Sequence, residues 1–431
     1  MWFRAFRRAS FGAVLALIAL GAFAVRLAAI YTRSTNFGFS DATYFYTQGR
    51  ALAHGAWFVN GLPYLMDGHK SPSAVHPPLF SMVLGLFSFL RFESIRSQQV
   101  LTAAFIGVGT VVLVGLAGRR LASARAGLIA AAIAAISPNL WTNDRLLLSE
   151  SLVALLAAAV VVAAVAYTQQ RTPTRAFAIG ALLALLTLTR AEGLMLFVLL
   201  AVPLVILGGS GATARTRVRD LALVAVAGAL IVGPWALFNL SRFNAPTFIS
   251  TNDGGVLADS YCNATFNGIK VGWWEEKCLP PARPGDESQE SRRLRKQALD
   301  YVRGHTKAVP RVVALRVGRL IELYRPWQTA LLDGVEGRGL AVARAGTIAW
   351  FLVMPLGIAG IIVLGARRRP VLPIVALVAV SVLTGAVFYG SPRFRVVAEV
   401  AMILSTGVAL DALWSACNAT RQGTRLSPVA S

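Results

Sequence analysis

The amino-acid sequence predicts an all-α integral membrane protein with about ten transmembrane helices. Composition is the first reason. Of the 431 residues, 56% are hydrophobic and only 14% are charged, whereas a soluble domain is about half apolar and about a quarter charged. The second reason is that the apolar residues gather in runs long enough to cross a bilayer, which takes about 20 residues.

The chain is also strongly basic, with 42 Lys and Arg residues against 20 Asp and Glu residues. Much of this charge stands in short arginine clusters between apolar runs, where the positive-inside rule and anionic lipid account for it. The sequence lacks a basic and aromatic surface module of the kind that binds nucleic acid. We therefore expect membrane lipids as partners and no nucleic acid.

The first apolar run, 11–31, follows a short basic segment. It is too long for the core of a signal peptide, which has about 7–15 residues, so we expect an uncleaved signal anchor. The other spans are expected at 98–118, 126–141, 151–167, 176–189, 193–208, 221–240, 343–365, 371–389 and 396–414.

Two of the apolar stretches, 126–167 and 176–208, are too long for one crossing. Polar residues interrupt the first at Ser137-Pro138-Asn139 and again at 142–145, and they interrupt the second at 189–193. We therefore expect each stretch to form a helical hairpin.

The segment 79–90 has about a dozen apolar residues, too few to cross, and is expected to form a juxtamembrane or re-entrant helix. With this choice and a cytoplasmic N-terminus, the arginine clusters fall on the cytoplasmic side, as the positive-inside rule requires. These clusters are Arg119/Arg120/Arg125, Arg171/Arg175, Arg215/Arg217/Arg219, Arg367/Arg368/Arg369 and Arg421/Arg425. A crossing at 79–90 would move all of them to the outside.

One polytopic domain, 1–431, is expected, with a first outer loop at 32–97, a long outer loop at 241–342 and a cytoplasmic tail at 415–431. In the long outer loop, apolar residues at helical spacing alternate with arginines over 309–324, which indicates an amphipathic helix on the membrane surface. Cys262 and Cys278 lie in the same loop. An extracytoplasmic location favours a disulfide between them, and two free thiols are the alternative.

The predicted topology places the unusual polar residues on one face, the outer one. These residues are Asp41, His54, Lys70, His76, Asp144, Glu150, Arg190, Glu192 and Arg393. Charged side chains at a membrane more often mark chemistry than packing. Their collection on one side predicts a site at the outer face.

Asp41 allows two interpretations. Ser40 and Asp41 begin a helical pattern that ends at Gly55, as an N-cap, a first-turn acid and a C-terminal glycine would. Alternatively, the Asp41 carboxylate is a general base that takes a proton from an attacking hydroxyl. His76 precedes two prolines that start a helix, and it either binds a phosphate, tunes this base or is structural. Lys70 either pairs with an anion or snorkels.

Arg190 and Arg393 are candidates for binding a phosphate leaving group, because a guanidinium can donate to two phosphate oxygens at once. Arg393 also stands on the outer side, against the positive-inside tendency. Asp144, Glu150 and Glu192 lie at the tips of the predicted hairpins. They belong either to solvated turns or to a water-filled funnel.

Six short motifs, in order over residues 10–415, resemble the membrane glycosyltransferases of the glycosyltransferase-C fold. That group includes the aminoarabinose lipid A transferases and the protein O-mannosyltransferases. The motifs are Ser40-Asp41-Ala42-Thr43-Tyr44, His76-Pro77-Pro78-Leu79, Leu188-Thr189-Arg190-Ala191-Glu192-Gly193, Gly233-Pro234-Trp235 with Asn239, Ser250-Thr251-Asn252-Asp253-Gly254-Gly255, and Arg393-Phe394-Arg395.

The resemblance implies a hexosyl- or pentosyltransferase of the bacterial plasma membrane. Such an enzyme moves a sugar from a polyprenyl-phosphate donor to a hydroxyl of a glycan, lipid or protein at the outer face. It implies Asp41 as the catalytic base and Lys70 as a contact of the donor phosphate, beside the candidates His76, Arg190 and Arg393.

No cofactor is certain from the sequence. Ala42 follows Asp41 where many members of the group have a second acid. A divalent cation would therefore need Asp144, Glu150 or Glu192 as a ligand.

Other interpretations stay open at this point. One is a non-enzymatic transporter or flippase of lipid-linked sugars, which inverted repeats and broken mid-membrane helices would support. Neither is visible in the sequence. The other is an inactive scaffold of the same fold, which would bind the donor without turnover.

Overall fold

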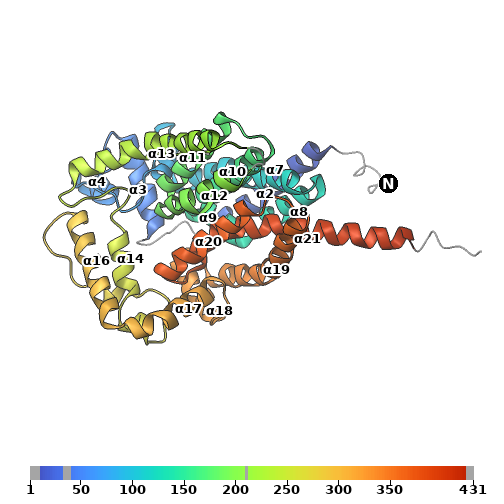
Figure 1. The fold of residues 1–431 in the computed structure, drawn as a ribbon. Coiled ribbons are helices and arrows are strands. Elements are labelled where there is room, and N and C mark those ends of the chain that lie inside the picture. Colours follow the sequence, from blue (N-terminus) through green and yellow to red (C-terminus); the bar gives the residue numbers. More distant parts are fainter. Residues whose placement is uncertain (1–9, 33–39, 209–211, 424–431) are drawn as a thin grey trace, which may run out of the picture.

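The computed structural model describes residues 10–32, 40–208 and 212–423, and most of these residues are helical (Figure 1). Within the described ranges no strand forms, and the one β-bridge pairs Val59 with Pro72. The predicted all-α class is therefore confirmed. The basic segment before Ser10, the start of the first outer loop at 33–39 and the last part of the predicted tail lie outside the described residues.

The first half of the chain forms helices of very different length. Their bounds are α2 Phe11–Tyr31, α3 Asp41–Ala53, α4 Gly61–Asp67, α5 Leu79–Phe89, α6 Ile95–Leu101, η1 Thr102–Gly107, α7 Val108–Leu121, α8 Ala124–Ile136, α9 Pro138–Leu146, α10 Glu150–Gln169, α11 Pro173–Thr189, η2 Ala191–Leu194, η3 Phe197–Ala201 and α12 Val202–Leu207.

In the second half, a long helix precedes the helices of the long outer loop in the sequence, and further long helices follow them. Their bounds are α13 Ala214–Arg242, α14 Asp253–Ser260, α15 Asn263–Phe266, η4 Glu276–Cys278, α16 Glu287–Gly304, η5 Thr306–Ala308, α17 Val309–Leu320, α18 Pro326–Asp333, η6 Gly334–Arg338, α19 Leu340–Ala366, α20 Leu372–Val387, η7 Pro392–Arg395 and α21 Val396–Gly423.

Each segment that the sequence predicts to span the membrane is helical, which makes this a multi-pass membrane protein. Within the described ranges, six helices are long and apolar enough to cross, and the pair α8–α9, bent by 49°, adds a seventh if it is one span. The six are Phe11–Tyr31, Ile95–Leu121, Glu150–Gln169, Ala214–Arg242, Leu340–Ala366 and Pro392–Ala419. Pro173–Thr189, Ala191–Leu207 and Leu372–Val387 are apolar but shorter. The number of about ten crossings thus stays a prediction.

The interruptions predicted at Ser137-Pro138-Asn139 and at 189–193 are present. The one predicted at 142–145 is wrong: these residues lie inside α9, which ends at Leu146. Ser137 has an extended backbone and Pro138 opens the next helix, because the ring of a proline disfavours helical backbone in the residue before it. The second stretch breaks at Arg190, which is also extended and leads into the short turn η2.

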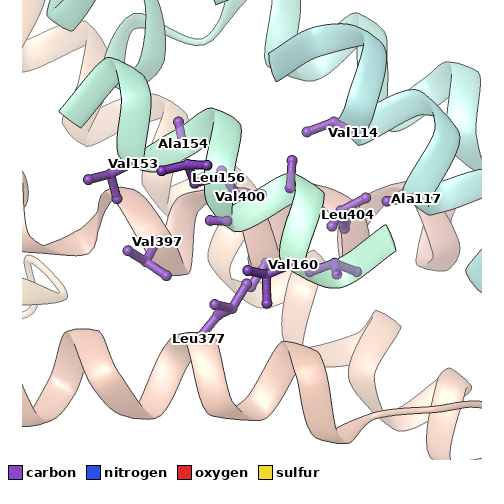
Figure 2. Close-up of a cluster of buried hydrophobic side chains, with 14 of the residues drawn as sticks. Val114, Ala117, Val153, Ala154, Leu156, Val160, Leu377, Val397, Val400 and Leu404 are labelled. Atoms are coloured by element: carbon purple, nitrogen blue, oxygen red, sulfur yellow. The ribbon is translucent and has the colours of Figure 1, made fainter. Parts of the chain in front are cut away.

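Helix α21 is the centre of the bundle: 83% of its spanning window is buried, and it packs against α19, α8, α20 and α10. Figure 2 shows Val397, Val400 and Leu404 of α21 among apolar side chains of α7, α10 and α20. The contact with α19 is close at Gly360, where an added Cβ would lie 1.8 Å from the Ser405 carbonyl oxygen. Small residues allow membrane helices to approach in this way.

The segments that the sequence predicts on the outer face gather at one end of the molecule. Figure 1 shows α3, α4, α14 and α16 together at this end, while the C-terminal part of α21 projects from the opposite end. Helix α5 forms where the sequence predicts a juxtamembrane helix and packs on α3. In the long outer loop, a disulfide joins Cys262 and Cys278.

The helix predicted over 309–324 forms as α17, but two of its arginines do not face outward. Arg316 and Arg319 are fully buried. Arg316 donates to the Ser260 carbonyl at 2.6 Å and Arg319 donates to the Val271 carbonyl at 2.6 Å. Carbonyls at a helix end, such as that of Ser260, or in a loop, such as that of Val271, need donors when they are buried, and the five N–H groups of a guanidinium supply them. These arginines therefore hold the loop together.

Candidate active site

Asp41 is the first residue of α3, directly after Ser40, whose backbone is extended as in an N-cap. The helix ends at Ala53, and Gly55 has a φ of +78°, a conformation that glycine adopts readily. The structural interpretation of this motif is therefore correct. It does not account for the contacts of the Asp41 carboxylate.

The Asp41 carboxylate lies between a histidine and an arginine and stays 33% exposed. Arg393 Nη2 donates to Oδ2 at 2.6 Å, and His76 Nε2 lies 3.3 Å from Oδ1. Burial raises the pKa of Asp41, but the charges of Arg393 and His76 outweigh burial and hold this pKa well below 3.8. Asp41 is therefore ionised at neutral pH.

His76 is held by the first outer loop itself. Its ring packs against Phe45 and Tyr44 of α3, with ring centroids 4.8 and 5.0 Å away. Pro77 and Pro78 follow and lead into α5, which packs against α3. The structure thus places His76 as a direct partner of the Asp41 carboxylate.

Each of the three nitrogen atoms of the Arg393 guanidinium faces a different carboxylate. Besides Asp41, its Nε donates to Glu150 Oε1 at 2.8 Å and its Nη1 lies 3.5 Å from Glu336 Oε2. These carboxylates belong to α3, α10 and η6. Three separate segments therefore converge on this one side chain.

Arg190 is the second cation of the site. Its Nη1 donates to Glu150 Oε1 at 3.1 Å, its Nε donates to Glu192, and its guanidinium lies 5.2 Å from the centre of the Phe394 ring. Glu150 is fully buried and accepts from both Arg190 and Arg393. It therefore fixes the two arginines relative to each other.

The turn η7 carries a second arginine that faces away from Asp41. Arg395 is buried in the bundle, where it pairs with Glu399 at 3.0 Å and Glu322 at 3.1 Å. It also donates to the Leu320 carbonyl at 2.7 Å and lies 4.0 Å from the Trp350 ring centre. Arg395 thus anchors the turn that presents Arg393.

Several of these residues line a cavity of about 370 Å³. Its polar lining includes Asp41, His76, Arg190, Glu192, Asn252, Asp253 and Arg393. Its apolar lining includes Met195, Val256, Leu383, Val387, Phe388 and Phe394. The cavity therefore offers charged and apolar walls to one ligand.

Two predicted site residues lie elsewhere. Lys70 is exposed and does not line the cavity; its Nζ lies 5.9 Å from the centre of the Tyr64 ring. Asp144 is buried beside α2, where its Oδ2 accepts from Arg26 Nε at 2.7 Å. A charge inside an apolar span requires a buried partner, so Arg26 was the signal in the sequence for this pair.

Glu336 and its partner Trp274 are the site residues that sequence reasoning did not find. Trp274 Nε1 donates to Glu336 Oε1 at 2.6 Å. Glu336 stands in a loop without hydrophobic periodicity or a known motif, so no pattern in the sequence marks it.

The acidic residues of the site gather around arginines and not around an open point between carboxylates. In the described part of the chain, no three His, Cys, Asp or Glu side chains lie close enough together to hold a metal ion. Asp41 and Glu150 are bridged by Arg393, and Glu150 and Glu192 are bridged by Arg190. The arrangement does not fit the divalent cation that the sequence left open.

Residues 75–238 match a sequence family described as dolichyl-phosphate-mannose-protein mannosyltransferase. The matched part includes His76, Glu150, Arg190 and Glu192, while Asp41 lies before it. No curated protein matches the chain in sequence.

The fold is similar to that of the archaeal oligosaccharyltransferase AglB from Archaeoglobus fulgidus. In its complex with an inhibitory peptide and a dolichol-phosphate, the TM-score is 0.56 at 16% identity, and the match covers 100% of this chain and 53% of AglB. The apo form also gives a TM-score of 0.56 at 16% identity, with 99% and 53% covered. This chain thus spans about half the length of these structures.

The two matches agree with each other. The chain has the glycosyltransferase-C fold of the archaeal protein, and residues 75–238 match a family described as mannosyltransferases. The resemblance in the sequence motifs is therefore confirmed.

Proposed function

We propose that this protein is a glycosyltransferase that moves a hexose or pentose from a polyprenyl-phosphate donor to a hydroxyl acceptor. We place the reaction at the outer face of a bacterial plasma membrane, with the N-terminus in the cytoplasm. The observation that carries the proposal is the ionised Asp41 carboxylate, which faces a cavity lined by Arg190 and Arg393. A base and two cations are what the displacement of a phosphate by a hydroxyl requires.

The proposed reaction is a single displacement. Asp41 takes the proton of the acceptor hydroxyl as the oxygen forms a bond to the anomeric carbon of the sugar. The bond between that carbon and the phosphate oxygen breaks, and its electron pair leaves with the polyprenyl phosphate. Arg190 and Arg393 stabilise the charge that develops on the phosphate, as fixed cations in a cavity do.

Arg393 links the donor to the base in this scheme. It donates to Asp41 at 2.6 Å, and this charge helps to lower the pKa of Asp41. A phosphate that binds Arg393 competes for the same N–H groups. The pKa of Asp41 then rises toward its ordinary value, and the carboxylate becomes a stronger base. Donor binding would thus activate Asp41.

The apolar wall of the cavity suits the lipid part of the donor. Leu383, Val387 and Phe388, at the end of α20, line it beside the charged residues. A polyprenyl phosphate has an apolar chain next to an anionic group, so its first isoprene units would lie against α20.

The test is sugar transfer from radiolabelled polyprenyl-phosphate sugars in membranes that hold equal amounts of wild-type protein, Asp41→Asn and Asp67→Asn. Asp67 is an exposed aspartate of the same loop that does not line the cavity, so it is the matched control. We expect Asp41→Asn to lower transfer by about 100-fold or more, and Asp67→Asn to leave it unchanged.

Strong transfer by Asp41→Asn would remove Asp41 as the base. No transfer by the wild-type protein with any donor of a broad panel would contradict the enzyme. Movement of lipid-linked sugar across vesicles would then favour the transporter.

A further inference from the structure

Glu336 contacts the site through Arg393, at the Nη atom that Asp41 does not use. Its carboxylate is 12% exposed and approaches Arg393 Nη1 at 3.5 Å. Its other oxygen accepts from the indole of Trp274 at 2.6 Å. Glu336 belongs to η6 and Trp274 precedes η4, so both residues come from the long outer loop.

The geometry fixes the plane of the Arg393 guanidinium. Nη2 is held by Asp41, Nε by Glu150 and Nη1 by Glu336. The first two carboxylates sit on the first turns of α3 and α10. Glu336 is the third carboxylate that orients Arg393, and it links this arginine to the long outer loop.

The surroundings of Glu336 are mostly acidic. The titratable and hydrogen-bonding groups that act on it or respond to it are Arg393, Asp333, Trp274, Asp41, Asp259 and Tyr389. Burial raises the pKa of Glu336 to about 7, with Asp333 and Asp41 adding to the rise while Arg393 and Trp274 oppose it. Glu336 therefore changes charge near neutral pH.

We propose that Glu336 is a positioning residue of the transfer reaction. It holds Arg393 through Nη1 and couples this arginine to Trp274. It also competes with the donor phosphate for the positive charge of Arg393. The proposal rests on the function proposed above. When Glu336 is ionised, part of the Arg393 charge is shared with it. When Glu336 is neutral, that charge is available to the phosphate.

The pH dependence follows with a definite sign. Glu336 is neutral below pH about 7 and ionised above it. The donor KM of the wild-type protein should therefore rise with pH, by up to about tenfold between pH 6 and pH 8 if the donor binds the neutral form.

The test compares Glu336→Gln with the wild-type protein. Glutamine keeps the size of the side chain and an oxygen for the Trp274 indole but cannot ionise. We expect a donor KM that stays low and flat from pH 6 to pH 8, and a kcat within a few-fold of the wild-type value. Glu276→Gln is the matched control, because Glu276 is an exposed acid of the same loop and should leave the wild-type pH profile intact.

Trp274→Phe tests the coupling to the loop separately. It keeps an aromatic ring and removes the hydrogen bond to Glu336. We expect this variant to lower kcat while the pH dependence of donor KM persists, because Glu336 still ionises.

A purely structural role predicts a different result. If Glu336→Gln changes kcat or thermal stability but leaves the rise of donor KM with pH unchanged, the proposal is wrong.

The two proposals can fail separately. If the wild-type protein transfers no sugar, binding of a short-chain polyprenyl phosphate is measured at pH 6 and pH 8. Binding that weakens with pH in the wild-type protein but not in Glu336→Gln would keep the role of Glu336. If both proteins bind the polyprenyl phosphate equally well at pH 6 and pH 8, that role is overturned. If neither protein binds it, both proposals are overturned.

Discussion

The candidate site is built from ion pairs in which each arginine serves more than one acid. Glu150 joins Arg190 to Arg393, and Arg393 joins Glu150 to Asp41. Removing one member of such a buried set leaves an uncompensated charge. A side chain of this site therefore cannot be exchanged without a change in the charge or orientation of its neighbours.

The low pKa of Asp41 predicts how activity responds to acid. A carboxyl group with a lowered pKa is protonated only when the pH falls through that low value, and the pKa of Asp41 lies well below 3.8. We therefore expect kcat/KM for the donor to show no loss between pH 7 and pH 5. The measurement is the initial rate of transfer at low donor concentration across this range. A decline with a midpoint at pH 5 or above would contradict Asp41 as the ionised base.

Single residues also show what the sequence could and could not predict about the site. One cavity is lined by Asp41, His76, Arg190, Glu192 and Arg393. The sequence could group these residues because hydropathy and arginine clusters indicate which loops lie on the same side of the membrane. Such reasoning assigns a side of the membrane and not a distance. It therefore placed Lys70 with the others, and it had no means of finding Glu336.

At the scale of helices, the apolar pattern predicted most bounds closely. The run 11–31 matches α2, and the break before Pro138 lies where proline chemistry puts it. For α17 the pattern predicted the helix but not its surroundings. Arginines at helical spacing look the same in sequence whether they face water or bind buried carbonyls. The carbonyls that the arginines of α17 bind belong to segments far away in the sequence.

The contact between α19 and α21 predicts a strong effect of one methyl group. Gly360→Ala would place a Cβ 1.8 Å from the Ser405 carbonyl oxygen, so the two helices must separate. Overpacking of this kind costs about 1–3 kcal/mol or more. Gly365→Ala is the matched control on the same helix, because nothing lies within 4 Å of its added Cβ. We expect a clear drop in the melting temperature of detergent-solubilised protein for Gly360→Ala alone; equal melting curves would refute this contact.

For the whole molecule, the proposed orientation can be tested with its own cysteines. The outer loop contains the disulfide between Cys262 and Cys278, and Cys417 is an exposed free thiol near the end of α21. Figure 1 places these parts of the chain at opposite ends of the bundle. In the proposed orientation, the three native cysteines therefore report on both sides of the membrane.

We expect a membrane-impermeant maleimide to leave the protein unlabelled in intact cells and to label Cys417 after the membrane is opened. Mild reduction of intact cells should expose Cys262 and Cys278 to the reagent. Cys417→Ser is the control that identifies the labelled site. Labelling of Cys417 in intact cells would reverse the proposed orientation.

The placement of Arg393 and Arg395 on one short turn has a consequence for the energetics of the proposed transfer. Arg395 is fixed in the bundle beside α21, the most buried of the spanning helices, so Arg393 is oriented before any ligand arrives. A preorganised cation needs little reorganisation when negative charge develops on a leaving phosphate. The ordering of the arginine is thus completed when the protein folds and does not recur in each turnover. By the same logic, mutations deep in the bundle should slow the reaction without touching the cavity.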